Sequence, residues 1–580
     1  MKNKQRNMMK KHLFPNFAVT MLMAFVAFST LNSCNEDIVV EKQEVQEENL
    51  DIPEGVTVFS ASDDATRTTM DSEGKFYWTD GDQIWVDVDK NGTFSKPSDD
   101  IRMSGDKRYA KFIIGRTLRD GPYNLTYTGV NSRSGTKVTI AAEQSQTMPN
   151  DPTHIGMDGD CASATATDEK NNGKYSFALN HKAHYLIFQP YKEEDNNSTW
   201  KLQKIEIIEL DGKPLSGTYD FGMAGLVASS VQNANSTMTL TISGEDGNGC
   251  ELHKEQGRDS WYVVIAPDPA GTTHRLKIKY HIKPPQLVNY IENGGDETFV
   301  ISRDEVNLPS TPNKVTRIKH KMKVERYSNS VFYMWDATAP YWQGVSNPPT
   351  YYGASAAGYP TSGDYRYTSR SGTAGPNNAQ NAPCKDLPNV NAATWYAMAG
   401  DPRWETEYPW CFDNDLDYIY TKGTWFLRWD NIVDANKSVL GNQTKTNCSV
   451  SFKGTNIPVY NSSGTITEYR NYNGADYRSQ AFPTNDAGAW FQSRNPNYKN
   501  NGRPAPSEIG NYFFLPANGH YSSAGLLALG GGIHGCYWLS GKKPGAATVY
   551  IMETKNFALQ VKQDNAGFRD GRPAVPDWWQ

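Results

Sequence analysis

The sequence QIWVDVDKNGTFSKPSD, residues 83–99, decides between two kinds of fold. Asp87, Asp89 and Asn91 stand at alternate positions before a glycine, which is typical of the first half of a calcium loop between two helices. Such a loop ends in a bidentate glutamate at its twelfth position, but Ser98 stands there. The residues before the loop alternate as in a strand, and an Asn-Gly pair favours a hairpin because both residues tolerate a positive φ. The stretch therefore predicts a hairpin turn in a β-rich fold rather than a metal site.

Short β-type segments continue on both sides of this turn. They are rich in Val, Ile and aromatic residues, and turns with Gly, Asp and Asn separate them, as in a sandwich. Examples are VTVFSA at 56–61, AKFII at 110–114, YNLTY at 123–127, AHYLIFQ at 183–189, LQKIEIIEL at 202–210 and SWYVVIAP at 260–267. The sequence ELDGKPLSGTYDF, residues 209–221, adds an Asp-Gly turn that we interpret as a further hairpin. We predict two β-sandwiches, at residues 53–172 and 173–325.

The composition changes near residue 326. Downstream, Trp, Tyr, Gly, Asn and Pro replace the aliphatic runs, so aromatic side chains must supply much of the core. The segment AATWYAMA, residues 392–399, is typical of a short helix, with Asn391 as its N-terminal cap and Gly400 after its last turn. We therefore expect residues 326–580 to form a mixed α+β domain with long ordered loops.

The start of the chain predicts export and a lipid anchor. Five Lys and Arg residues precede an apolar run at 17–31 that is too short to span a bilayer. The run ends in Leu-Asn-Ser-Cys, which resembles a bacterial lipobox, so that cleavage between Ser33 and Cys34 would leave Cys34 as the lipidated first residue. An ordinary cleaved signal with an incidental cysteine is the alternative. We interpret residues 1–33 as a signal peptide and residues 34–52, which are acidic and lack aromatics, as a tether.

Charge and motifs argue against several classes of function. The formal net charge of the whole chain is −6, and removal of the signal peptide takes away five positive charges and no negative one. The acidic surface that remains does not suit the binding of nucleic acid. The chain has no His-Glu-x-x-His, no phosphate-binding Gly-x-x-x-x-Gly-Lys and no Gly-x-Ser-x-Gly. His520 and His534 lie near Cys536 in the sequence, but we interpret all three as structural. We expect neither an enzyme nor a cofactor.

Two features stay open on the sequence alone. Six cysteines follow Cys34, and their spacing selects no pairing and contains no Cys-x-x-Cys. Asp413, Asp415 and Asp417 form a second possible ligand set for calcium, but the set lacks the glycine of a calcium loop and is equally typical of a solvated loop. We assign no metal site.

Tryptophans beside polar, proline-rich sequence are candidates for ligand contact. Trp404, Trp410 and Trp578 meet this description, as does Trp579. Exposed aromatic rings stack on sugars and anchor protein interfaces. The alternative is that at least half of these rings belong to the aromatic core.

Longer stretches resemble a known family. They are TRTTMDSEGKFYWTDGDQIWV at 66–86, TIAAEQSQT at 139–147 and FALNHKAHYLIF at 177–188, and they resemble signature segments of the fimbrillin family in its Mfa-like branch. The last third resembles a C-terminal domain related to C-type-lectin-like and paralogous surface domains, through YMWDATAPYWQG at 333–344, YFFLPANGHY at 512–521 and AGFRDGRP at 566–573. Residues 536–541 read CYWLSG where that domain usually has YYWSSS. The sugar-binding tripeptides of calcium-dependent lectins are absent, so we expect no calcium-dependent lectin mechanism.

The resemblance implies a mainly β fold class, with two tandem transthyretin-like β-sandwiches followed by an α+β, C-type-lectin-like domain. It also implies a surface-exposed pilus subunit that is exported as a lipoprotein of the cell outer membrane and joins a fimbrium by donor-strand addition. In the family an Arg-directed protease removes the N-terminal segment, and the matching position here is Arg67, with Thr68 as the new first residue.

The length of chain past the second sandwich favours a tip or accessory subunit, which accepts a strand and donates none. The expected partners are other fimbrial subunits, the membrane through the lipid, and a host or bacterial surface protein or glycan. The alternative is an outer-surface lipoprotein that binds glycans or proteins without entering a pilus.

Overall fold

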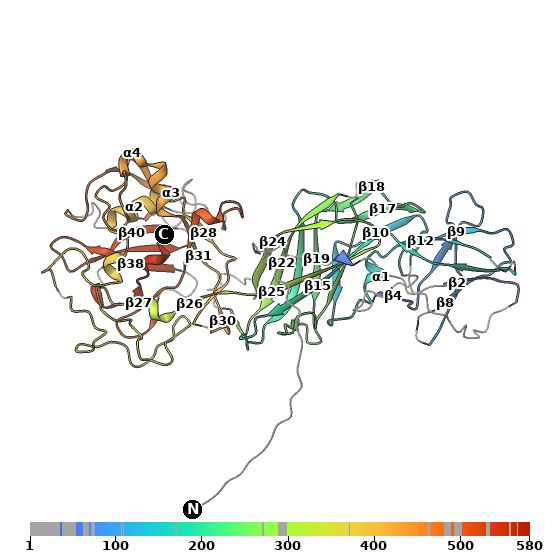
Figure 1. The fold of residues 1–580 in the computed structure, drawn as a ribbon, viewed down its shortest axis with the longest axis horizontal. Helices are drawn as coiled ribbons and strands as arrows, with labels where there is room; N and C mark the ends of the chain where they lie inside the picture. Colours follow the sequence, from blue (N-terminus) through green and yellow to red (C-terminus); the bar gives the residue numbers. More distant parts are fainter. Residues whose placement is uncertain are drawn as a thin grey trace, which may run out of the picture.

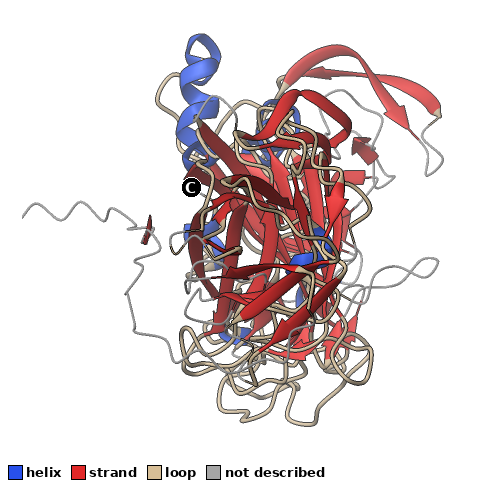
Figure 2. Ribbon diagram, turned by 90° about the vertical axis from the view of Figure 1, so that its right-hand side faces the viewer, coloured by secondary structure: helices blue, strands red, loops and turns tan. Residues whose placement is uncertain are grey.

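Three bodies follow one another along a rod in the computed structural model (Figure 1), and we call them N-terminal, central and C-terminal. The structure describes residues 35–36, 54–61, 69–70 and, from 76 to 579, every residue except 106, 108, 131, 169, 171, 269–271, 288–297, 371, 414, 461–464, 481–488, 492–501, 529–533, 556–557 and 565–566. The fold is mainly β, as predicted, and Figure 2 shows how few helices accompany the strands.

The N-terminal body consists of two sheets around one apolar core. One sheet has the order β13 (Lys174–Phe177), β2 (Thr57–Ala61), β8 (Ala110–Ile114), β7 (Asp100–Met103). The other has the order β14 (Asn180–His181), β12 (Ala162–Ala166), β9 (Tyr123–Tyr127), β5 (Ile84–Val86), β6 (Lys96–Pro97). A separate pair joins β3 (Thr69–Met70) to β4 (Phe76–Tyr77). Both large sheets contribute to the same core, which includes Phe59, Ile84 and Phe112.

The loop that opens the sequence analysis is a hairpin connection, as predicted. Strands β5 and β6 pair in antiparallel register on either side of it. The Asp87 carboxylate accepts hydrogen bonds from the backbone N–H groups of Asn91 (3.1 Å) and Gly92 (2.8 Å), so it closes the turn. The left-handed residues are Lys90 (φ 52°) and Gly92 (φ 81°), so the turn is not built on positive φ at both Asn91 and Gly92.

The central body has three sheets around a largely aliphatic core. The first sheet has the order β1 (Asn35–Glu36), β25 (Lys314–Met322), β15 (His184–Lys192), β21 (Trp261–Ile265). The second has the order β11 (Glu143–Gln146), β19 (Thr237–Ile242), β16 (Lys201–Glu209), β22 (Thr273–Lys283), β24 (Phe299–Pro309). The third has the order β10 (Lys137–Ile140), β17 (Ser216–Gly222), β18 (Gly225–Asn235). The short strand β20 (Cys250–Glu251) pairs with β16. Strand β15 is buried almost throughout because it lies between β25 and β21 and both of its faces are covered.

After β2, the described chain crosses between the N-terminal and central bodies three times. After β9 it enters the central body, where β10 pairs with β17 and β11 pairs with β19. The short helix α1 (Ile155–Asp158) also belongs to the central core through Ile155. The chain then returns for β12, β13 and β14 and leaves again at β15. Residues 137–146 therefore lie in the central body, although the predicted boundary at residues 172/173 assigns them to the first sandwich.

The Asp-Gly turn at residues 211–212 does not join a hairpin. Gly212 has a φ of 76°, so the turn itself is present. However, β16 before it pairs with β19, β20 and β22, while β17 after it pairs with β10 and β18. The turn therefore connects two different sheets, and the hairpin partner of β17 is β18, the strand that follows it.

The C-terminal body combines sheets with three helices, α2 (Val390–Ala399), α3 (Trp429–Ala435) and α4 (Lys437–Leu440). Its larger sheets have the orders β34 (Ala489–Phe491), β40 (Ala558–Asp564), β39 (Val549–Lys555), β38 (His534–Lys542) and β28 (Arg403–Glu405), β31 (Gly423–Leu427), β35 (Tyr512–Pro516). Two-stranded pairs are β32 (Lys453–Tyr460) with β33 (Ile466–Asn473), β36 (His520–Tyr521) with β37 (Leu527–Ala528), and β27 (Phe332–Tyr333) with β41 (Arg572–Pro573). Fully buried tryptophans, among them Trp335 and Trp538, confirm the predicted aromatic core.

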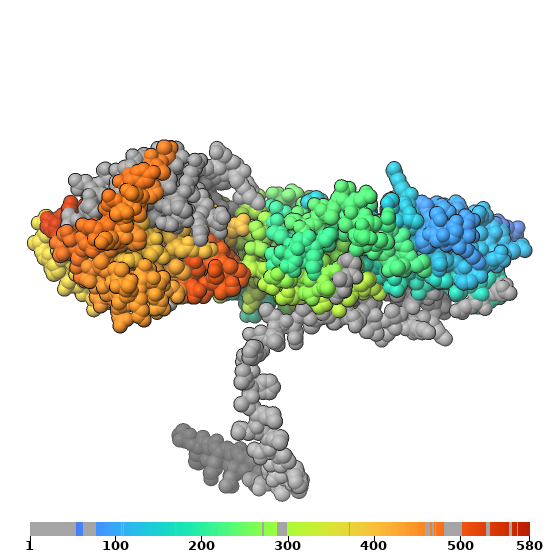
Figure 3. All heavy atoms as spheres, turned by 90° about the horizontal axis from the view of Figure 1, so that it is seen from above, coloured from blue at the N-terminus to red at the C-terminus, as the bar shows by residue number. Residues whose placement is uncertain are grey.

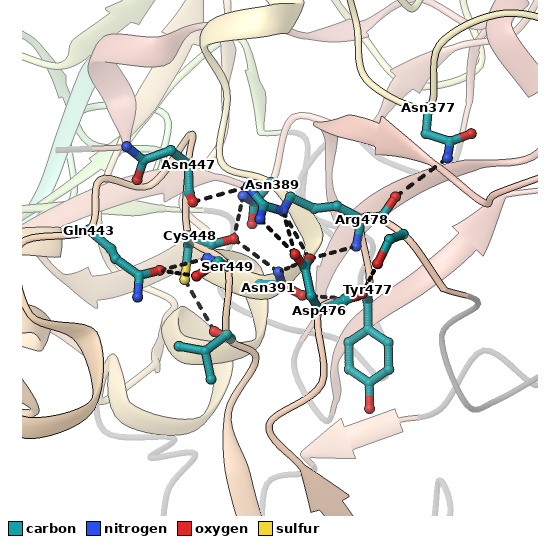
Figure 4. A network of polar contacts seen from close by, with 12 residues as sticks. Asn377, Asn389, Asn391, Gln443, Asn447, Cys448, Ser449, Asp476, Tyr477 and Arg478 are labelled. Carbon is teal, nitrogen blue, oxygen red and sulfur yellow. Dashed lines mark hydrogen bonds and ion pairs between the residues drawn. The ribbon is translucent and has the colours of Figure 1, made fainter.

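Helix α2 begins two residues earlier than predicted. Its N-terminal cap is Asn389, whose side chain accepts a hydrogen bond from the Ala392 N–H (3.0 Å). Asn391 lies inside the helix, and its side-chain amide donates to the Cys448 carbonyl (2.9 Å) and to Asp476 (2.8 Å). Figure 4 shows how this amide sits between two loops that are distant in sequence. The residue therefore stabilises tertiary structure rather than the helix end.

The central and C-terminal bodies share part of one apolar core. Strand β26 (Glu325–Tyr327) pairs with β29 (Trp410–Phe412), and β23 (Gln286–Leu287) pairs with β30 (Tyr418–Ile419). Leu416 of the C-terminal body packs within the central core, and its carbonyl accepts a hydrogen bond from the Trp200 indole (2.9 Å). Figure 3 shows the bodies as one continuous row of atoms. Among the described residues, no helix has the length and apolarity required for a membrane span.

Candidate functional site

Strand β2 occupies an inner position in its sheet. It pairs with β8 in antiparallel register from Thr57 opposite Ile114, and with β13 in parallel register from Val58 opposite Lys174. Both of its backbone edges are thus hydrogen-bonded. Its departure would leave a slot between β8 and β13 with two unpaired edges, which is the geometry that a strand from another chain can fill.

The side chains of β2 anchor it in the core. Phe59 is fully buried and stacks on the Tyr175 ring at 5.1 Å between centroids, with Tyr123 edge-on at 6.2 Å. Val58 and Ala61 are buried as well. A replacement strand would need apolar side chains at the positions of these residues.

The predicted processing positions lie outside the described residues. This applies to Ser33 and Cys34 at the signal cleavage point, and to Arg67 and Thr68 at the pro-segment cleavage point. Arg67 lies between β2 and β3 in sequence. Cleavage there would therefore separate β2 covalently from the rest of its sheet.

Two of the predicted ligand-contact tryptophans are in the core. Trp404 is 1% exposed and Trp410 is 0% exposed, and Trp410 stacks on Tyr420 at 4.4 Å. Trp579 is buried too, whereas Trp578 is half-buried and lies edge-on to Tyr327. Trp404 and Trp410 therefore offer no surface to a ligand here, because the scarcity of aliphatic residues draws these large rings into the core.

A polar pocket of about 520 Å³ lies near the junction of the central and C-terminal bodies. Its walls come from residues 328–350 and from Asp413 and Asp415. Asp417 does not line it, so the structure does not bring all three predicted aspartates to one site. Among the described residues, no group of three or more His, Cys, Asp and Glu side chains could hold a metal ion.

Exposed tyrosines gather beside this pocket, and the sequence analysis did not single them out. They come from YYGASAAGYPTSGDYRY, residues 351–367, where Gly and Ser leave the rings few covering neighbours. Tyr351, Tyr352 and Tyr365 are 43%, 48% and 63% exposed. Tyr351 stacks on Tyr418, which follows the pocket aspartates, at 4.7 Å between ring centroids. The sequence signal that could have revealed them is the repetition of Tyr among small residues.

Cys536 is buried beside a cation rather than paired with a histidine. Its thiol contacts the guanidinium of Arg572, which also contacts Asp564 and lies 3.0 Å from Asp570. Burial raises the pKa of Cys536 to about 12, so the thiol stays protonated and is a poor nucleophile. This arrangement fits the structural role expected for Cys536.

The buried histidine His520 makes the C-terminal body sensitive to acid. Burial, together with nearby Arg572, lowers the pKa of His520 from 6.5 to about 3, although its Nε2 lies 3.5 Å from Asp570. Below about pH 6.5 the unfolded chain takes up a proton that the folded chain does not. The free energy of unfolding should therefore fall as the pH falls from 6.5 towards 3, by about 1.4 kcal/mol per pH unit for this group.

Urea denaturation followed by near-ultraviolet circular dichroism at pH 7, 6 and 5 tests this prediction. His520→Gln should reduce the pH dependence of the free energy of unfolding by the part due to one proton. The part due to His534, His184 and His320 should remain, because burial lowers the pKa of each of them as well. A slope unchanged by the substitution would contradict the assignment.

The six described cysteines form no disulfide. Cys161, Cys384, Cys411, Cys448 and Cys536 are buried, and Cys250 is half-buried. Packing and hydrogen bonds, rather than covalent cross-links, therefore stabilise the fold around these cysteines.

No protein-family model and no curated protein matches the chain. Among solved structures, a candidate cell adhesion protein from Bacteroides uniformis is 13% identical with a TM-score of 0.24, and the match covers 39% of this chain and 80% of that one. A candidate cell adhesion protein from Bacteroides ovatus is 15% identical with a TM-score of 0.25, covering 42% of this chain and 83% of that one. A fimbrial protein from Bacteroides ovatus is 10% identical with a TM-score of 0.21, covering 90% and 98%. At these identities and TM-scores, the likeness carries no argument about the fold or function of this chain.

Proposed function

We propose that this protein is a surface-exposed pilus subunit, at the tip or in an accessory position, that assembles by donor-strand addition and adheres through its C-terminal body. The observation that carries the proposal is the inner position of β2 between β8 and β13. Loss of β2 after cleavage at Arg67 would open a slot with two unpaired strand edges, and a strand from a neighbouring subunit would restore both ladders. The lipid on Cys34 would hold the precursor at the outer membrane before cleavage.

The packing of the C-terminal segment supports a subunit that accepts a donor strand and does not donate one. Strands β38, β39 and β40 form one sheet, and residues after them pack back onto the aromatic core through Phe568 and Trp579. The Trp579 ring lies 5.4 Å from the Tyr396 ring. A segment buried in this way is not free to serve as a donor strand.

Mass spectrometry of the N-terminal peptide tests the proposal. We expect protein from sheared surface filaments to begin at Thr68 and protein from the outer-membrane fraction to begin at acylated Cys34. The Arg67→Ala variant should be exported and acylated but absent from filaments. Acylated Cys34 in membranes, with none of the protein in filaments of the wild type, would overturn the pilus role.

The second candidate is an outer-surface lipoprotein that binds glycans or proteins without entering a pilus. The exposed tyrosines beside the polar pocket favour it, because a binding surface of this kind does not require polymerisation. The same experiment separates the two candidates, since this lipoprotein keeps its N-terminal tether.

A further inference from the structure

We infer that the pocket between residues 328–350 and the aspartates Asp413 and Asp415 binds a short neutral saccharide. The inference deepens the adhesive part of the proposed function and rests on it, but it does not depend on strand addition. The volume of about 520 Å³ lies within the range of about 300–1,000 Å³ that small-ligand pockets occupy.

The lining of the pocket suits hydroxyl groups. Neutral hydrogen-bonding side chains predominate, among them Ser328, Ser330, Gln343 and Asn347. No Lys, Arg or His is among the described residues that line it. Phosphate or carboxylate ligands would therefore meet two aspartates without a compensating cation, which disfavours acidic sugars.

Two of the polar groups are held in place by the protein. The Asp413 carboxylate accepts a hydrogen bond from the Asn329 backbone N–H (2.6 Å), and the Asp415 carboxylate accepts one from the Thr350 hydroxyl. In each case the bond uses one oxygen, Oδ2, and leaves Oδ1 of the same carboxylate for a ligand hydroxyl. Fixed acceptors bind more tightly because less side-chain freedom is lost on binding.

A buried amide at the pocket also lacks a partner. Asn329 lines the pocket and is 2% exposed, and its Oδ1 accepts a hydrogen bond from the Tyr521 hydroxyl (3.1 Å). Its Nδ2 has no hydrogen-bond partner among the described residues. Because this atom is closed off from solvent, Asn329 holds the pocket wall in place through its backbone N–H and its Oδ1 rather than by contacting a ligand through Nδ2.

Apolar rings complete the match to a sugar, which has both hydroxyl groups and C–H faces. Trp342, Pro340 and Val345 line the pocket itself. Directly after the lining residue Thr350, Tyr351 stacks on Tyr418 with an interplanar angle of 15°, so the pair presents a flat aromatic surface. The stack also keeps the partly exposed Tyr351 ring in one orientation.

Two other ligand classes are weaker fits. A divalent cation requires more charged or carbonyl ligands than the two aspartates that line the pocket. A basic peptide could use the aspartates and tyrosines, but it would leave the many neutral side chains of the pocket without ligand hydroxyls to bind. Both classes become outcomes of the test.

The test uses the purified full chain. Binding is measured by isothermal titration with a panel of neutral methyl glycosides and disaccharides, with an Arg- and Lys-rich peptide, and with calcium chloride. We expect at least one neutral saccharide to bind, and Asp415→Asn and Tyr351→Ala each to weaken it by about tenfold or more. Tyr469→Ala is the matched control: Tyr469 is 63% exposed, but it lies on β33, no residue of which lines the pocket, whereas Tyr351 follows the lining residue Thr350; its loss should therefore leave the affinity unchanged.

Several results would overturn the inference. They are no binding across the saccharide panel, binding of the peptide or calcium only, or saccharide binding that Asp415→Asn and Tyr351→Ala leave intact. Melting curves identify a variant that fails to fold, in which case Thr350→Val replaces Asp415→Asn and Gln343→Ala replaces Tyr351→Ala. None of these results changes the N-terminal peptide found in filaments, so failure of this inference is distinguishable from failure of the pilus role.

Discussion

Replacing Arg572 with methionine is expected to lower the free energy of unfolding of the C-terminal body by about 3–5 kcal/mol. Arg572 is 3% exposed, and its guanidinium binds the buried Asp570 and the half-buried Asp564. It also lies over the Trp538 ring, 4.8 Å from the centroid. Removal of this cation takes the guanidinium away from two carboxylates that are largely out of water, which costs far more than loss of a surface ion pair.

Urea denaturation at pH 7 measures the effect, and a neighbouring arginine gives the control. Arg569 is exposed and lies over the Tyr367 ring at 5.8 Å, so Arg569→Met should change stability by no more than about 0.5 kcal/mol. Adding Asp564→Asn and Asp570→Asn to Arg572→Met should recover part of the loss, because the uncompensated charges are then absent. Equal effects of the two single arginine substitutions would contradict the prediction.

The second large effect is expected from Phe59→Ala, which should lower the free energy of unfolding of the N-terminal body by about 3–5 kcal/mol. Phe59 is fully buried between the Tyr175 and Tyr123 rings, so the substitution creates a cavity in the middle of β2. The neighbouring Ser60 is only half-buried, and Ser60→Ala should cost less than about 1 kcal/mol.

The same pair of variants connects stability with processing. If β2 leaves its sheet after cleavage at Arg67, then weakening it should speed removal of the fragment that precedes Thr68. Limited digestion with an Arg-specific protease, followed by gel filtration, measures how much of this fragment remains bound. We expect faster release for Phe59→Ala than for Ser60→Ala. Equal release from both variants would show that the side chain of Phe59 does not hold the strand.

Local features of the fold follow from the sequence, but strand partners do not. The turn near Asn91 is decided within a few residues, because Asp87 and Gly92 supply the hydrogen bond and the backbone freedom that the turn requires. The Asp-Gly turn at 211–212 is equally visible. That it joins two sheets depends on distant strands, and no property of residues 209–221 encodes those strands.

The candidate site was predictable only in part. An abundance of aromatic residues indicates an aromatic core but not which rings it includes, so Trp404 and Trp410 are as plausible at the surface as Trp578. The pocket is harder still, because the pairing of β26 with β29, which are distant in sequence, brings residues 328–350 next to Asp413 and Asp415. Asn389 and Asn391 are also alike as caps in the sequence, and only the loop that contains Asp476 distinguishes them.

The three crossings between the N-terminal and central bodies that follow β2 have a mechanical consequence. Bodies joined by one linker behave like beads on a string, and tension passes through a single peptide segment. Here tension along the rod is shared by the segments between β9 and β10, between β11 and β12, and between β14 and β15. The two bodies cannot be pulled apart at a linker unless β10 and β11 leave the central sheets or β12 to β14 leave the N-terminal ones. Under shear at a surface, these two bodies would therefore yield by unravelling strands rather than by swinging on a hinge.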